Sequence, residues 1–483
     1  MTNITSERNL TLLMDFYELT MAGGYFEKGY TDKIAVFDMF FRKIPDEGGF
    51  AIMAGLEQFC NIIDDLHFSE DDVAYLAEKG CFSDGFLNYL RHFEFHCNIW
   101  AVREGTPIFP GEPIVTVEGP CIEAQLIETL LLVTFNHQSL ICTKTSRIVR
   151  AAGGRAVMEF GSRRAQGYDA AVLGARAAYI GGVAGTACVM ADRLFGIPAL
   201  GTMAHSWVQM FGSEYEAFKN YAELYPDNCV LLVDTYSVVK SGVPNAIKVF
   251  DEVLKPMGIR PKGIRIDSGD IAYLSKKARA ILNEAGYSDV PICASNSLDE
   301  YIVRDLLLQG ACLDNFGIGE NMITSKSDPV FGGVYKLAAV KEKGEYIPKI
   351  KLSESAEKIT LPHLKKLWRI YDDETGKAMA DYITMWDESV STNGGISLFD
   401  PVQTWKTRTF TNVHAELLST VIYENGKRVY ELPKLCDIRA FCAKQIDTLW
   451  DEVTRFENPH RYYVDLSRKL WDERNRLLTQ FGR

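Results

Sequence analysis

The segment Ile197-Pro198-Ala199-Leu200-Gly201-Thr202-Met203-Ala204-His205-Ser206 begins with an apolar run and passes directly into small and polar residues. The apolar half predicts a short buried strand, because strands buried in a parallel sheet are almost continuously apolar. Parallel α/β folds place their chemistry at the carboxyl ends of such strands. Thr202, His205 and Ser206 are therefore candidate site residues, although a single histidine is more often a buried hydrogen-bonding residue than a catalytic one.

Similar runs recur between about residue 145 and residue 335, where helical patterns separate them. This alternation predicts parallel βαβ units. Polar or glycine-rich residues come directly after each apolar run. This is the pattern of a closed barrel, in which the strand ends meet around one opening. An open parallel sheet would instead bind its ligand mainly in a crevice at the point where the strand order reverses. Six candidate strands fall short of eight, so we expect an irregular, incomplete α/β barrel; the candidates are 156–160, 198–201, 230–233, 263–266, 290–294 and 315–318.

The rest of the chain suggests two further regions around this barrel. We expect an α+β domain over 1–144, with 340–430 packed against it, the barrel over 145–339, and a helical region over 431–483 that ends in a charged amphipathic tail. Apolar spacing and Gly or Pro punctuation support this division. Within the first domain they predict a helix over 9–22 closed by Gly23-Gly24, strands over 34–42 and from 97, a meander over 103–117 and a helix over 122–133.

Composition narrows the class of protein. The chain has 483 residues, 47% of them hydrophobic, and a formal net charge of -12. That balance suits a globular protein with a large core and argues against binding nucleic acid, which needs a basic face. Residues 1–8 lack a signal-peptide pattern, and no apolar run is long enough to span a membrane. The 11 scattered cysteines include no C-x-x-C pair, which predicts reduced thiols in the cytoplasm and no zinc site.

The expected strand ends together carry groups suited to an anionic substrate. Arg163 and Arg164 offer forked donors for a carboxylate or a phosphate, and the glycines of 317–319 allow backbone N–H groups to approach a phosphate. Asp234, with Asp267 and Asp270 of the segment 267–270, could hold ribose hydroxyls or a hydrated Mg²⁺. The segment 267–270 would equally make a helix-capping turn. Paired acids on a barrel also suit glycoside hydrolysis, which would need neither the arginines nor the glycines.

Six segments together resemble the nicotinate phosphoribosyltransferase family, in the family's order and over most of the chain. A single match of this kind would be weak, whereas six in order are highly specific. The segments are DFYELTMA (15–22), EFGSRRA (159–165), GTMAHS (201–206), LVDTY (232–236), RIDSGD (265–270) and GVYKL (333–337).

This resemblance implies a type II phosphoribosyltransferase with an N-terminal α/β domain, an irregular α/β barrel and active sites shared across a homodimer. The implied reaction converts nicotinate and phosphoribosyl pyrophosphate into nicotinate mononucleotide and pyrophosphate, with Mg²⁺ and coupled to ATP hydrolysis, in NAD salvage. His205 would be transiently phosphorylated by ATP. The pyridine ring would lie between Phe160 and the partner subunit's Tyr17, and Arg163, with Arg164, would face a carboxylate or phosphate.

The resemblance also assigns the remaining contacts to the sugar and its phosphates. Arg265 and Asp267 would hold the ribose and phosphates, and Gly317 and Gly319 would cradle the 5-phosphate. Glu320 directly follows those glycines, where many family members have a neutral or basic residue. Further substrate contacts are expected from Thr202, Ser206, Asp234 and Gly269, and Mg²⁺ contacts from Asp267 and Asp270.

Several alternatives stay open at this point. The same fold could act on nicotinamide or quinolinate, although the segment 181–186 lacks the acid that the related nicotinamide enzyme uses to accept the amide. A barrel glycosidase and a non-catalytic nucleotide-binding protein are the competitors from other classes. The lysine-rich segment 341–366 is read as a solvated surface, or as a cover over phosphates.

Overall fold

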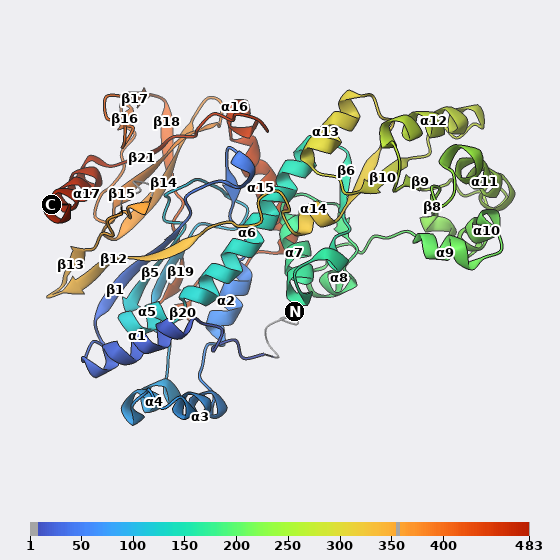
Figure 1. The fold of residues 1–483 in the computed structure, drawn as a ribbon. Helices are drawn as coiled ribbons and strands as arrows, with labels where there is room; N and C mark the ends of the chain where they lie inside the picture. Colours follow the sequence, from blue (N-terminus) through green and yellow to red (C-terminus); the bar gives the residue numbers. More distant parts are fainter. Residues whose placement is uncertain (1–7, 354–357, 483) are drawn as a thin grey trace. The chain divides into compact units, whose positions relative to one another are not determined.

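The computed structural model describes residues 8–353 and 358–482, which form two compact units (Figure 1). Unit 1 comprises Met1–Thr143 and Val330–Arg483 in their described parts, and unit 2 comprises Lys144–Pro329. The segment 1–7, which lacks a signal-peptide pattern, lies outside the described residues, as does 354–357 of the lysine-rich segment.

The core of unit 1 is built on a seven-stranded antiparallel sheet. Its strands come from both parts of the chain that form unit 1, and β1 is buried along nearly its whole length. The strands expected over 34–42 and from 97 are confirmed as β1 and β3. In spatial order the sheet contains β13 (Glu345–Pro348), β12 (Val334–Glu342), β1 (Ile34–Phe40), β5 (Val115–Pro120), β3 (Asn98–Ala101), β19 (Thr420–Glu424) and β20 (Lys427–Arg428).

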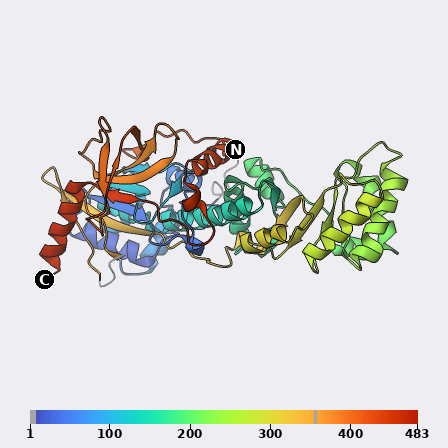
Figure 2. The same cartoon turned by 90° about the horizontal axis from the view of Figure 1, so that it is seen from above.

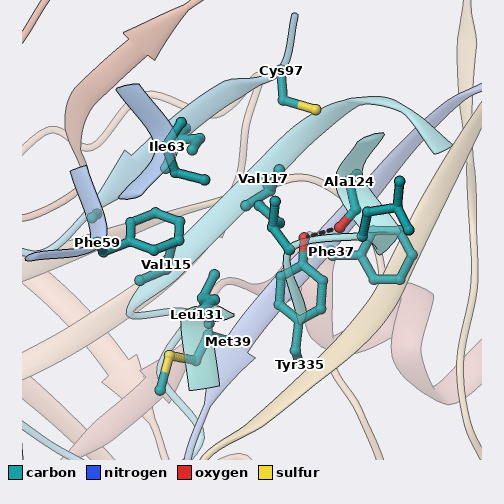
Figure 3. Close-up of a cluster of buried hydrophobic side chains, with 14 of the residues drawn as sticks. Phe37, Met39, Phe59, Ile63, Cys97, Val115, Val117, Ala124, Leu131 and Tyr335 are labelled. Atoms are coloured by element: carbon teal, nitrogen blue, oxygen red, sulfur yellow. Dashed lines mark hydrogen bonds between the residues drawn. The ribbon is translucent and has the colours of Figure 1, made fainter. Parts of the chain in front are cut away.

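Aromatic and aliphatic side chains from this sheet and the adjoining helices form the core of unit 1 (Figure 3). The ring of Phe37 stacks on that of Tyr335 with centroids 4.9 Å apart. The buried Tyr335 hydroxyl donates a hydrogen bond of 2.9 Å to the Ala124 carbonyl, so its polar atom has a partner inside the apolar cluster. Strand β12 is thereby held to the short helix α5 (Cys121–Gln125), which precedes the long helix α6 (Glu128–Ala151).

The first helix differs from its expected bounds. Helix α1 (Phe16–Glu27) begins after a capping box formed by Asp15 and Glu18, so residues 9–14 lie before it in turns. It also continues through Gly23-Gly24, which the sequence predicted as its end. Gly23 packs against the Phe86 ring, because a Cβ there would lie 3.4 Å from that ring. This tertiary contact outweighs the low helix propensity of glycine. The other helices before α6 are α2 (Leu56–Asp64), α3 (Glu70–Glu78), α4 (Asp84–Arg91) and α5 (Cys121–Gln125).

A second, four-stranded sheet completes unit 1. Its order is β18 (Val413–Leu417), β14 (Lys365–Asp372), β15 (Ala378–Met385) and β21 (Val464–Leu466). The sequence predicts a charged amphipathic tail at the end of the chain, over 461–478. In the structure, the helical part of this tail begins at residue 468. The remaining elements of unit 1 are β2 (Ala51–Ile52), β4 (Pro107–Ile108), β16 (Ile396–Phe399), β17 (Thr407–Phe410), η1 (Pro45–Glu47), α15 (Leu435–Asp447), α16 (Asp451–Thr454) and α17 (Arg468–Phe481).

Unit 2 contains a six-stranded, wholly parallel sheet, and the irregular α/β barrel expected from the sequence is confirmed in this curled form (Figures 1 and 2). The strands expected at 156–160, 230–233, 263–266 and 315–318 are confirmed, and the one at 290–294 lies two residues later. In spatial order they are β7 (Gly185–Thr186), β6 (Ala156–Glu159), β11 (Asn315–Ile318), β10 (Ile292–Asn296), β9 (Gly263–Ile266) and β8 (Val230–Leu232).

The prediction of a full strand over 198–201 is wrong. Only an isolated parallel bridge forms there, between Thr186 and Ala199, because Pro198 has no N–H to donate and the partner strand β7 has two residues. Helices follow the strands of unit 2, and α12 packs against β9 and β10. They are η2 (Ser162–Arg164), α7 (Tyr168–Ile180), α8 (Val189–Phe195), α9 (His205–Met210), α10 (Glu214–Leu224), η3 (Pro226–Asn228), η4 (Val238–Gly242), α11 (Val243–Val249), η5 (Phe250–Leu254), α12 (Ile271–Glu284), α13 (Glu300–Leu308) and α14 (Glu320–Ile323). Within residues 8–353 and 358–482, no helix combines the length and apolarity needed to cross a membrane.

A buried ion pair joins two strands of the four-stranded sheet. Arg369 and Asp381 are both 0% exposed, with Arg369 Nη2 2.6 Å from Asp381 Oδ2. Arg369 also donates to the Pro107 carbonyl at 2.8 Å. Burial and the nearby charge of Asp381 raise the pKa of Glu112, beside the pair, well above its usual range.

We expect Arg369→Met to lower the free energy of unfolding of unit 1 by about 3–5 kcal/mol, because the Asp381 carboxylate would stay buried without its counter-charge. Lys469→Met is the matched control, since it breaks an exposed pair with Asp387 and should change stability by at most about 1 kcal/mol. Denaturant unfolding of both variants measures the difference. Equal stabilities would contradict a structural role for the buried pair.

Candidate active site

The imidazole of His205 lies at the carboxyl edge of the parallel sheet of unit 2. His205 is the first residue of α9, and its side chain is 38% exposed. Its Nδ1 is 3.1 Å from the Thr235 hydroxyl, which follows β8. Its Nε2 is 4.0 Å from Asp234 Oδ1 and 3.8 Å from Asp267 Oδ2. One ring nitrogen is therefore held by the protein, and the other faces two carboxylates.

The two carboxylates are themselves fixed by short local contacts. Asp234 is 2% exposed, and its Oδ2 accepts hydrogen bonds from the Asp267 amide at 3.0 Å and the Ser268 hydroxyl at 2.6 Å. Asp267 Oδ1 accepts from the Ser295 hydroxyl, which lies on β10. Asp234 Oδ1 is buried, and no donor among the described residues hydrogen-bonds to it. The site thus keeps one carboxylate oxygen available beside the imidazole.

This donor set fits a hydrated magnesium ion. Mg²⁺ prefers oxygen ligands and is usually bound by one or two carboxylates together with water and substrate phosphates. Asp234 Oδ1 and Asp267 Oδ2 are such oxygens. The described residues contain no group of three or more His, Cys, Asp or Glu side chains that could hold a metal alone. Asp270 serves as the N-cap of α12, where it accepts from the Tyr273 amide at 3.0 Å.

The segment that carries His205 connects the two edges of the sheet. At one edge, Thr186 of β7 exchanges backbone hydrogen bonds with Pro198 and Leu200, at 3.0 and 2.8 Å. Near the other edge, Arg265 of β9, the strand next to the edge strand β8, donates to the Thr202 hydroxyl. The Arg265 side chain is 14% exposed, and its Nη2 lies 3.9 Å from Asp267 Oδ1. The segment between β7 and β9 therefore closes the mouth of the incomplete barrel.

The ring of Phe160 explains the two glycines near it. A Cβ on Gly317 would lie 2.5 Å from the Phe160 ring, and one on Gly319 would lie 2.8 Å from the Phe160 carbonyl oxygen. The Phe160 amide donates to the Ile318 carbonyl at 2.8 Å, which extends the pairing of β6 with β11. Both glycines are therefore required for close packing, whatever they contact in a bound substrate.

Two arginines lie in the turn η2 after Phe160. Arg163 and Arg164 are both exposed. Arg164 Nε is 3.6 Å from Glu320 Oε2, and Lys326 Nζ is 2.7 Å from Glu320 Oε1. The Lys326 ammonium holds the pKa of Glu320 below its usual range. Glu320 is thus a local counter-ion for two cations that surround the strand end.

The other predicted site residues lie in varied surroundings. Ser206 is exposed on α9, and Gly269 has a φ of +84° in the turn before α12, which favours glycine. Tyr17 belongs to unit 1, where it is 44% exposed on α1, and burial with the nearby Glu128 charge raises its pKa.

Sequence reasoning missed Thr235 and Ser295 as site residues. Both follow or end a strand, and that position is the signal that could have identified them.

Most of the chain matches models of one enzyme family. Residues 12–136 match the nicotinate phosphoribosyltransferase (NAPRTase) N-terminal domain, residues 155–360 match the nicotinate phosphoribosyltransferase (NAPRTase) family, and residues 364–474 match the nicotinate phosphoribosyltransferase C-terminal domain.

Individual proteins are similar over nearly the same length. The nicotinate phosphoribosyltransferase of Bacillus subtilis is 42% identical over 468 residues, which cover 96% of this chain and 94% of that protein. The protein of the same name from Dictyostelium discoideum is 34% identical, over an alignment that covers 96% of this chain and 88% of that protein. The crystal structure of human nicotinic acid phosphoribosyltransferase superposes with a TM-score of 0.85 at 30% identity, over 96% of this chain and 100% of that one.

We expect Gly317→Ala to destabilise unit 2 by about 1–3 kcal/mol, because the added methyl group would overlap the Phe160 ring. Gly201→Ala is the matched control, since a Cβ there meets no atom within 4 Å. Replacing Phe160 by Leu in the Gly317→Ala background should restore part of the loss. Thermal unfolding measures all three, and an unperturbed Gly317→Ala variant would rule out the packing role.

Proposed function

The chain belongs to the nicotinate phosphoribosyltransferase family, and from this we propose that it joins nicotinate to the ribose of phosphoribosyl pyrophosphate. The products would be nicotinate mononucleotide and pyrophosphate. As a member of this family the chain is a pentosyltransferase. We further propose that the reaction is coupled to ATP hydrolysis through a phosphorylated His205 and that it serves NAD salvage in the cytoplasm.

The arrangement of His205 is the observation that supports ATP coupling. The Thr235 hydroxyl occupies Nδ1, so Nε2 is the nitrogen that remains for a phosphoryl group. Nε2 would attack the terminal phosphorus of ATP, the bond from that phosphorus to the bridging oxygen would break, and ADP would leave. Water would later cleave the P–N bond and release phosphate. The 38% exposure of the side chain is compatible with access to the nucleotide.

The facing carboxylates suggest why magnesium is needed. A phosphoryl group on Nε2 would add about two negative charges, by analogy with other phosphorylated side chains. Nε2 already lies 4.0 and 3.8 Å from Asp234 and Asp267 oxygens, so repulsion would be strong without a cation. Asp234 and Asp267 would hold Mg²⁺ at this point. When bound, the ion would supply counter-charge and ease the departure of pyrophosphate.

The other side chains at the mouth would position the substrates. Displacement of pyrophosphate passes through a cation-like sugar, so orientation and charge contribute more than a protein nucleophile at that carbon. Arg265 and Asp267, at the end of β9, would hold ribose and phosphate oxygens. Phe160 would cover one face of the pyridine ring, and Arg163, with Arg164, would face the carboxylate.

Unit 1 carries features that suit a shared site in a homodimer. Tyr17 is 44% exposed on α1, beside Phe16 at 53%, so an aromatic surface is presented there. A cavity of about 780 Å³ in the same unit is lined by several basic side chains, among them Arg42, Lys336 and Arg474. We propose that unit 1 of one subunit offers the partner subunit's barrel an aromatic ring for the pyridine and positive charge for the phosphates.

We expect incubation with ATP labelled at its terminal phosphate to give an acid-labile, alkali-stable label on the native chain. His205→Asn should abolish the label, because the variant lacks the Nε2 nucleophile. Asn98→Ala, on β3 of unit 1, is a control that should keep it. Label that persists in His205→Asn would move the phosphorylated residue elsewhere, and a native chain without label would contradict ATP coupling through histidine.

We expect pyrophosphate release to be faster with nicotinate than with nicotinamide by about 10- to 100-fold in kcat/KM. An amide would leave an arginine unpaired, which costs about 1–3 kcal/mol. Arg163→Ala should remove most of this preference. A preference for nicotinamide or quinolinate would favour the related transferases, and glycoside cleavage without phosphoribosyl pyrophosphate would favour the glycosidase alternative.

A further inference from the structure

Glu159 is a buried carboxylate directly beneath the proposed site. It is the last residue of β6, its exposure is 0%, and Phe160 follows it. We propose that Glu159 is a positioning residue: it fixes the turn that carries Phe160, Arg163 and Arg164 relative to the segment that leads to His205. This role rests on the proposed function, because it concerns how the base is held next to the phosphorylated histidine.

One carboxylate oxygen of Glu159 fixes the turn. The Gly161 amide donates to Glu159 Oε1, and the Arg164 amide in turn donates to the Gly161 carbonyl at 2.7 Å. The turn has no room to shift, because a Cβ on Gly161 would lie 2.7 Å from the Ile323 side chain and 2.8 Å from Glu159 Oε1. The path of the chain after Phe160 is therefore set by this contact.

The second oxygen connects the same carboxylate to the neighbouring strand. The Thr186 hydroxyl of β7 donates to Glu159 Oε2 at 2.6 Å and accepts from the Cys188 amide at 2.9 Å. The backbone of Thr186 also forms hydrogen bonds with Pro198 and Leu200. Residues 198–200 lead directly to Thr202 and His205. Glu159 thus joins the turn with the predicted base contacts to the arm that carries the histidine.

Packing alone does not explain a carboxyl group at this position. Burial raises the pKa of Glu159, while the hydrogen bonds from Thr186 and Gly161 oppose that shift. A buried carboxylate is unfavourable compared with an apolar side chain of similar volume. Both oxygens are used to connect the turn with β7, which an apolar residue could not do. Glu159 acts through these neighbours, and its oxygens are directed to Thr186 and Gly161.

The proposal can be tested with Glu159→Gln and Glu159→Met in the full chain. Gln can keep both contacts, because its Oε1 accepts from Gly161 and its amide nitrogen can donate to the Thr186 hydroxyl oxygen, which reverses the direction of that hydrogen bond. Met has a similar length and can form neither contact. We expect the KM for nicotinate to rise about 10- to 100-fold in Glu159→Met, as small misplacements do, and to stay within about threefold in Glu159→Gln. His205 should still be labelled by ATP in both variants. A purely structural role would lower the active fraction, and hence kcat, without changing this KM.

A second pair of variants leaves Glu159 in place, in case Glu159→Met does not fold. Thr186→Val removes the hydroxyl and Thr186→Ser keeps it, so we expect a raised KM for nicotinate only in Thr186→Val. Equal KM values in these two variants, or a native KM in folded Glu159→Met, would overturn the positioning role. Loss of ATP labelling in the native chain would instead overturn the proposed phosphohistidine, so the two failures are distinguishable.

Discussion

The closure of the sheet by the segment 198–205 is the constraint on which the geometry of the mouth depends. Thr186 on the edge strand β7 binds the start of this segment, and Arg265 and Thr235, near the other edge, contact Thr202 and His205. An open parallel sheet would leave its two edges far apart, because neighbouring strands lie about 4.8 Å from one another. The crossing segment brings residues from opposite edges together, and it places the imidazole over Asp234 and Asp267.

Buried polar atoms without a hydrogen bond occur in both units. In unit 1, Arg369 makes a two-point contact with Asp381 and donates to the Pro107 carbonyl, while its Nη1 has no hydrogen-bond partner among the described residues. At the mouth of unit 2, a buried oxygen of Asp234 likewise has no hydrogen-bond partner among the described residues. An unsatisfied buried oxygen is unfavourable in the absence of a ligand. Under the proposed function, a bound cation or substrate would supply the missing partner of the Asp234 oxygen.

The sequence predicted the features that depend on local pattern. The sequence predicted β8, β9 and β11 from continuous apolar runs, and the candidates Asp234 and Asp267 follow β8 and β9. His205 is instead a candidate because it follows the strand expected at 198–201. The sequence-based prediction could not capture pairing between distant segments. It failed where pairing is tertiary: β7 has two residues, and the expected strand at 198–201 became a single bridge. The contacts of His205 with Thr235 and of Asp267 with Ser295 join residues 30 and 28 positions apart, so no local pattern could reveal them.

Gly317 illustrates how one residue can satisfy two requirements that sequence reasoning cannot separate. The sequence suggested a glycine that admits a phosphate, whereas the structure gives a glycine that admits the Phe160 ring. Both requirements call for a residue without a side chain at position 317. The same logic applies to Glu159, whose buried carboxylate supports the chain on which Phe160 lies. Rigid support beneath the proposed substrate contacts is what precise orientation of two reactants would require.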